Sequence, residues 1–166
     1  MRDKPLRVAY LQRYLPRTSE TFVLDEAMML GRLGVDLQIW TLDWSDKDLM
    51  HARHEPLHAR ARIVPRSSSV RTIFAALGIE EMPGYSRVFG NWSRHARLRD
   101  LRRVAWLART WCREGVDVIR VHHAAETARY GVSAGLLAGI PVSVAVHARD
   151  LFVPTTDMSW LVHAAS

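Results

Sequence analysis

The sequence predicts an α/β domain, with an open parallel β-sheet and helices on both of its faces. The first observation behind this prediction is that two strand–helix–strand units follow one another along the chain. The second is that several of their strands are nearly continuous apolar runs, as expected where a parallel sheet is buried on both faces. The third is size: 166 residues, 48% of them apolar, suit one globular domain over residues 1–166.

The first unit lies near the N-terminus. Arg7–Leu11 is a short apolar run typical of a buried strand, and Pro16 interrupts the segment that follows it. Ser19 is a favourable N-cap for a helix, because apolar residues recur after it at helical spacing until Gly34, a natural stop. Residues 35–42 alternate between apolar and polar side chains, which predicts a second strand parallel to the first.

The middle of the chain is polar, rich in arginine and histidine, and predicts mainly helices. Residues 61–65 favour a short strand, and the serines at 67–69 favour a cap for a helix over residues 70–78. Residues 93–114 predict a long amphipathic helix, with apolar side chains along one side and arginines over much of the rest. Cys112 falls on the apolar side, which predicts a buried and chemically inert thiol.

The second unit lies towards the end of the chain. Residues 116–121 predict a strand, and residues 124–138 predict a helix whose small side chains allow close packing on the sheet. Gly139 and Pro141 end this helix. Residues 141–146 predict the next strand, which should run parallel to the one before it.

Positive charge is concentrated in one block of the sequence. The net charge is +6, and 21 of the 23 basic residues are arginines. Residues 51–113 hold 13 basic and 4 acidic residues, whereas the segments on either side are nearly neutral. The block indicates a solvated helix face or an anionic membrane surface rather than nucleic acid, for which no binding motif is present. The candidate surface residues lie on the predicted long helix: Arg97, Arg99, Arg102 and Arg103.

Composition excludes several classes of protein. No apolar run approaches the roughly 20 residues of a membrane-spanning helix, and the first residues lack the apolar core of a signal peptide. The single cysteine excludes an internal disulfide framework and a multi-cysteine zinc site. We therefore expect a cytoplasmic protein, peripheral to the inner face of the plasma membrane if the basic block binds lipid.

Function is expected at the carboxyl ends of the strands, where open parallel sheets bind ligands. Three predicted segments lie there: residues 12–20, 122–124 and 147–152. The first of them delivers a helix N-terminus, whose free N–H groups can bind an anion. However, it lacks a glycine-rich turn, and Glu20 would repel a phosphate.

Polar side chains in the other two segments are candidates for ligand contacts. Arg149 suits a phosphate, and Asp150 suits sugar hydroxyls or an ion pair with Arg149 that closes the loop. His122, His123 and His147 do not predict a metal site. Adjacent residues of an extended chain point to opposite faces, and no cysteine or carboxylate stands beside them at ligand spacing.

Several segments carry a resemblance to a known family. Pro16–Val23, which follows the strand at Arg7–Leu11, contains Pro-Arg-Thr-Ser-Glu-Thr-Phe, and Ile140–Phe152 contains Ile-Pro-Val-Ser and His-Ala-Arg-Asp-Leu-Phe. These segments resemble the opening turn, the Gly-Ile-Pro strand and the His-Ala-x-Asp-Ile motif of retaining GT-B glycosyltransferases of the colanic-acid and exopolysaccharide type (family 4-like). Ile119–Ala124 resembles their His-x-His-Phe-Ala segment, with an arginine in place of its first histidine and a histidine in place of its phenylalanine.

The resemblance implies the N-terminal, acceptor-side half of a GT-B fold, with a Rossmann-like sheet. Such enzymes move a sugar from a nucleotide-sugar to a glycan or lipid-linked acceptor, without a metal or other cofactor. The nucleotide-sugar-binding C-terminal domain is absent from these 166 residues, so the isolated chain is not expected to transfer sugar. His147 would be catalytic, and the substrate would contact Arg17, Ser19, Glu20, Thr21, His122, Arg149 and Asp150. The alternative is a non-catalytic α/β module that binds an anionic membrane or a partner through the basic helix.

Overall fold

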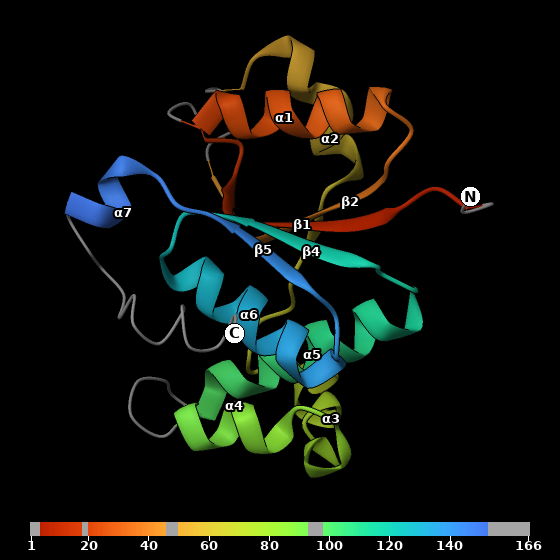
Figure 1. Cartoon of the computed structure of the whole chain (residues 1–166), viewed down its shortest axis with the longest axis vertical. Coiled ribbons are helices and arrows are strands. Elements are labelled where there is room, and N and C mark those ends of the chain that lie inside the picture. The colour runs from red at the N-terminus through yellow and green to blue at the C-terminus, as the bar shows by residue number, and fades with distance from the viewer. Residues whose placement is uncertain (1–3, 18–19, 46–49, 93–97, 153–166) are drawn as a thin grey trace.

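The structure is a computed structural model that describes residues 4–17, 20–45, 50–92 and 98–152. Its centre is a five-stranded parallel sheet in the order β3-β2-β1-β4-β5 (Figure 1). This order, which starts in the middle and grows to both sides, is that of a Rossmann-like α/β fold and confirms the predicted fold class. The strands are β1 (Arg7–Leu15), β2 (Asp36–Trp44), β3 (Arg62–Ile63), β4 (Val118–His122) and β5 (Val142–Ala145).

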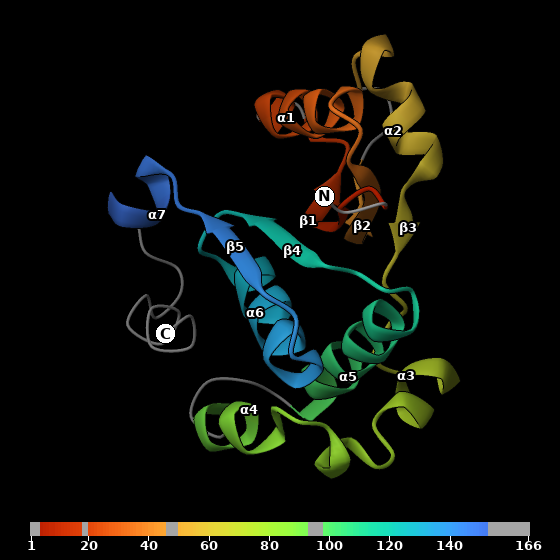
Figure 2. The same cartoon turned by 45° about the vertical axis from the view of Figure 1, so that its right-hand side comes forward.

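Helices cover both faces of the sheet (Figures 1 and 2). On one face lie α1 (Thr21–Arg32) and α2 (Glu55–Arg60), and on the other lie α5 (Leu98–Arg113) and α6 (Glu126–Ala138). Within the described residues, no helix is both long and apolar enough to cross a membrane. The remaining helices are α3 (Val70–Ala75), α4 (Tyr85–Trp92), α7 (Ala148–Phe152) and the short 3₁₀ helices η3 (Ala52–His54) and η4 (Ile79–Glu81).

The central strand β1 is buried on both faces, because its side chains alternate between two apolar cores. Ala9 and Leu11 share one core with side chains of α5 and α6. Val8 and Tyr10 share the other with side chains of α1. Burial on both faces explains why this strand is a nearly continuous apolar run in the sequence.

The main difference from the predicted boundaries is the length of β1. It continues to Leu15, because β2 keeps pairing with it as far as Trp44. Helix α1 begins at Thr21, with Glu20 in the N-cap position. The predicted cap, Ser19, and the first residues of the predicted long helix lie outside the described residues. Helices α2 and α4 were not predicted from the sequence.

The prediction for Cys112 is wrong, because its side chain is exposed. The residue lies in the last turn of α5, next to the buried Trp111. Its Sγ atom lies 3.6 Å from the carbonyl oxygen of Ala138, at the end of α6. The apolar side of α5 is therefore buried as far as Trp111, and Cys112 lies at its edge.

Two arginines of the basic block bind carbonyl groups of the backbone. Arg103 donates hydrogen bonds to carbonyl oxygens of β2 and of the residue after β3, at 2.7 and 3.2 Å, so it does not belong to the predicted anion-binding surface. Arg109 donates to three carbonyl oxygens at and after the end of α3. Of the other predicted surface residues, Arg102 is exposed, whereas Arg97 and the side chain of Arg99 lie outside the described residues.

Candidate functional site

Three histidines meet at the carboxyl edge of the sheet. His122 is the last residue of β4, His123 follows it, and His147 lies between β5 and α7. The rings of His122 and His147 are stacked with centroids 5.5 Å apart, and the ring of His123 lies 4.6 Å from that of His147. Phe22, at the start of α1, packs edge-on against His147 with ring centroids 5.1 Å apart. The structure thus brings the start of α1 together with the segments after β4 and β5, at the edge of the sheet where the sequence predicted a ligand site.

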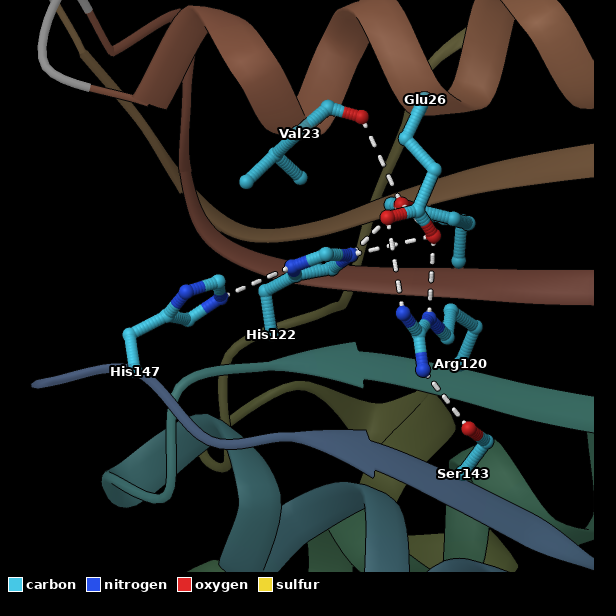
Figure 3. A network of polar contacts seen from close by, with 7 residues as sticks. Val23, Glu26, Arg120, His122, Ser143 and His147 are labelled. Atoms are coloured by element: carbon cyan, nitrogen blue, oxygen red, sulfur yellow. Dashed lines mark hydrogen bonds and ion pairs between the residues drawn. The ribbon is translucent and has the colours of Figure 1, made fainter.

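His122 lies behind His147 and is not open to solvent. Its side chain is 3% exposed, its Nδ1 lies 3.2 Å from His147 Nε2, and its Nε2 lies 2.6 Å from the hydroxyl of Tyr10 (Figure 3). Burial lowers the pKa of His122 to about 4, so the ring is neutral at physiological pH. The predicted substrate contact through His122 is therefore replaced by an indirect role: it supports His147.

A partly buried polar network continues from His122 to helix α1. The Tyr10 hydroxyl donates to Glu26 Oε1 at 3.0 Å. Arg120 donates to the same carboxylate through Nε, at 3.1 Å, and to Ser143 Oγ through Nη1, at 2.7 Å. Burial would raise the pKa of Glu26, but the hydrogen bonds from Arg120 and Tyr10 and the nearby positive charge lower it overall. Glu26 is therefore ionised, whereas burial and this carboxylate raise the pKa of Tyr10 and keep its proton in place.

The strand register explains why these side chains meet. Tyr10 stands opposite Arg120, and Arg120 stands opposite Ser143, so the three residues lie in one row across β1, β4 and β5. Glu26 reaches this row from α1. No role for these residues was predicted from the sequence. The available signal was a polar side chain inside a mostly apolar strand, as with Arg120 in β4 and Ser143 in β5.

Asp150 holds the loop that carries His147. Its Oδ2 accepts a hydrogen bond from the backbone N–H of His147 at 2.9 Å, and its own N–H donates to the carbonyl oxygen of His147 at 2.9 Å. This reciprocal pair resembles the capping box of a helix N-terminus. Because Asp150 is only 7% exposed, the predicted direct substrate contact gives way to a structural role. The side chain of Arg149 lies outside the described residues.

Glu20 is held on the opposite side of the site by two basic groups. Its Oε1 lies 2.9 Å from Arg17 Nη1 and 3.4 Å from His123 Nε2. His123 also approaches Asp150, with 3.6 Å between Nδ1 and Oδ2, and its backbone adopts a positive φ of 67°. Thr21 is half-buried at the first position of α1. His123 therefore links two of the predicted site residues, a role that the sequence analysis did not assign.

The open part of the site is small and mixed in character. Phe22 is 45% exposed, His147 is half-buried and Arg17 is exposed. The described residues contain no group of three or more His, Cys, Asp and Glu that could hold a metal ion. What remains for a ligand is an aromatic ring, one imidazole and one guanidinium, which suit a hydroxylated molecule. Comparisons with protein-family models, with curated proteins and with solved structures found no match to this chain.

Proposed function

We propose that this chain is the acceptor-side domain of a glycosyltransferase, which moves a sugar from a nucleotide-sugar to a glycan or a lipid-linked acceptor. One observation carries the proposal. The two segments on which the sequence resemblance depends, at the start of α1 and at His147–Asp150, form opposite sides of one site at the carboxyl edge of the sheet. A second domain would hold most of the nucleotide.

The chemistry of the site supports a sugar ligand. Sugars present hydroxyl groups around apolar C–H faces, so a polar group beside an exposed aromatic ring offers both contacts they need. His147 supplies the polar group and Phe22 the ring. Glu20 and Asp150 flank His123 from the two sides of the site, and their carboxylates disfavour a phosphate there.

The proposal is tested by titrating the ¹⁵N-labelled chain with glucose, galactose, mannose and N-acetylglucosamine as methyl glycosides. We expect at least one glycoside to shift the NMR signals of Phe22, His123 and His147, with weak affinity because only part of the substrate is present. His147→Ala should weaken that binding by about tenfold, the loss of one hydrogen bond to a well-placed ligand group. His51→Ala is the matched control, because His51 is an exposed histidine on another part of the chain. A glycoside response that is absent from this site, or unchanged in His147→Ala, contradicts the proposal.

A second candidate function, contact with an anionic membrane, is favoured by the surface of α3. Val70, Ile73, Phe74 and Leu77 lie at helical spacing in and just after this helix, and all four are exposed. An exposed apolar stripe of this kind is typical of helices that lie in a membrane interface. Figure 2 shows α3 at the outer side of α5, away from the carboxyl-edge site.

The charges around this stripe favour an anionic lipid surface. Arg66 precedes α3 and Arg71 lies on it, and both are exposed. The acidic pair at Glu80 and Glu81 follows in η4, so the basic character is strongest at the start of α3. We place the membrane-contacting surface here rather than on the arginines of α5. A lipid-linked acceptor would make this surface compatible with the glycosyltransferase proposal.

Vesicle flotation tests the membrane candidate. We expect the chain to float with vesicles of phosphatidylcholine and phosphatidylglycerol but not with phosphatidylcholine alone. Phe74→Ser combined with Leu77→Ser should reduce the bound fraction at least fivefold, about the effect of losing 1 kcal/mol of binding free energy. Leu33→Ser is the control, because Leu33 is 73% exposed and directly follows α1, a helix on the other face of the sheet. Equal binding to both vesicle types, or an equal loss in Leu33→Ser, contradicts membrane docking through α3.

A further inference from the structure

A continuous chain of hydrogen bonds leads from the half-buried carboxylate of Glu26 to the open site. It runs from Glu26 through Tyr10 and His122 to His147, with successive distances of 3.0, 2.6 and 3.2 Å between polar atoms (Figure 3). Only its last member, His147, faces the site, since the ring of His122 and the hydroxyl of Tyr10 are buried. Each group in the chain has a limited set of protons to donate, so the direction of every bond can be worked out.

Tyr10 fixes the direction of the first two bonds. Its hydroxyl lies 3.0 Å from Glu26 Oε1, 3.4 Å from the carbonyl oxygen of Val23 and 2.6 Å from His122 Nε2. The ionised carboxylate and the carbonyl can only accept hydrogen bonds, whereas the imidazole nitrogen can donate or accept. The Tyr10 proton therefore points to Glu26, and the short contact with His122 requires an N–H on Nε2 that donates to the Tyr10 oxygen.

The same reasoning extends to His147. A neutral His122 that carries its proton on Nε2 has only a lone pair on Nδ1, so Nδ1 must accept from His147 Nε2. A neutral His147 then has its proton on Nε2 and a lone pair on Nδ1. Among the described residues, none hydrogen-bonds to His147 Nδ1, so that lone pair is left for a ligand.

We propose that Glu26 and Tyr10 are positioning residues that hold His147 as the Nε2–H tautomer, so that its Nδ1 accepts a hydrogen bond from a hydroxyl group of the ligand. The tautomer depends on the contacts of this chain alone. The identification of the donor as a sugar hydroxyl rests on the proposed function. A ligand with only acceptor groups, such as a phosphate oxygen, gains nothing from this nitrogen.

Arg120 and Ser143 support this arrangement, because Arg120 holds Glu26 in its ionised form and Ser143 holds Arg120. Arg120 donates two bonds to the carboxylate, at 3.1 and 3.4 Å, and a third to Ser143. The guanidinium spans both carboxylate oxygens, and Oε1 accepts the Tyr10 proton as well. Outer groups commonly fix the tautomer of a functional histidine in this way, most clearly in metal sites.

The tautomers are read directly by long-range ¹H–¹⁵N NMR of the histidine-labelled chain, with no ligand present. We expect both His122 and His147 to show a protonated Nε2 and an unprotonated Nδ1. In Tyr10→Phe the acceptor 2.6 Å from His122 Nε2 is lost and only Glu26 Oε1, at 3.5 Å, remains, so both rings should become mixtures of tautomers. In Glu26→Gln the amide nitrogen can donate to Tyr10, which frees the Tyr10 proton for His122 and permits the reversed chain.

Tyr14→Phe is the matched control, because Tyr14 also lies on β1 but contacts the guanidinium of Arg13 through its ring and is not a member of this chain of bonds. It should leave both tautomers unchanged. A protonated Nδ1 on His147 in the unaltered chain overturns the proposal, and so do tautomers that stay unchanged in both Tyr10→Phe and Glu26→Gln. Glycoside titration of the same samples separates the positioning role of Glu26 and Tyr10 from the proposed function. A correct tautomer without any glycoside binding contradicts the proposed function only, and a wrong tautomer with binding contradicts the positioning role only.

Discussion

Trp40→Ala is expected to lower the free energy of unfolding by about 4 kcal/mol, the usual cost of removing a fully buried tryptophan. Trp40 is 1% exposed on β2 and packs edge-on against two aromatic rings of α5, Trp106 and Trp111, at centroid distances of 5.6 and 6.5 Å. Its ring also carries the guanidinium of Arg62, 3.9 Å from the centroid. The substitution therefore opens a cavity between the sheet and α5 and also removes a cation–π contact.

Urea unfolding followed by circular dichroism measures this loss. Trp44→Ala is the control, because Trp44 lies near the end of the same strand but is 38% exposed. It should cost about 1 kcal/mol or less, as expected for a side chain that stays partly in water. If the two variants lose the same stability, the core between β2 and α5 is not packed as the structure shows.

The fold was predictable because its strands are recognisable as apolar runs in the sequence. A strand buried on both faces, such as β1, must be apolar at nearly every position, and α6 carries the small residues that close packing requires. Helix α4 was missed because Tyr85–Trp92 mixes glycine, polar and aromatic residues. Its place depends on contacts with α6, which local sequence does not contain.

The meeting of the candidate side chains was predictable, but their individual contacts were not. The rule that ligands bind at the carboxyl ends of parallel strands placed His122 and His147 near each other. The direction of each side chain depends on register, which a single sequence does not contain. Thus His122 and Asp150 were taken for ligand contacts, although one is buried beneath α1 and the other caps α7. Glu26 stayed unnoticed because nothing in the sequence pairs it with Tyr10.

Gly135→Ala is expected to destabilise the domain by about 2 kcal/mol, although alanine is the better helix former by about 1 kcal/mol. A Cβ atom at this position of α6 would lie 2.2 Å from Val142 Cγ2 and 2.8 Å from the carbonyl oxygen of Ile140. Both contacts are too close, and the second is to backbone, which cannot rotate away. The helix and β5 must therefore move apart, and the loss should appear in urea unfolding.

Gly31→Ala is the matched control, since Gly31 lies inside α1 and its added Cβ would meet only Leu37 Cδ1, at 3.8 Å. It should stabilise the chain by up to about 1 kcal/mol, so the two glycine variants shift stability in opposite directions. A displacement of β5 should also change the candidate site, because β5 leads into His147 and pairs with the end of β4. In Gly135→Ala the His122–His147 hydrogen bond should weaken and the ring signals should broaden, with Gly31→Ala unchanged. A stabilised Gly135→Ala would mean that α6 does not lie against β5 at this distance. The position of β5, and with it that of His147, would then not depend on the packing of α6.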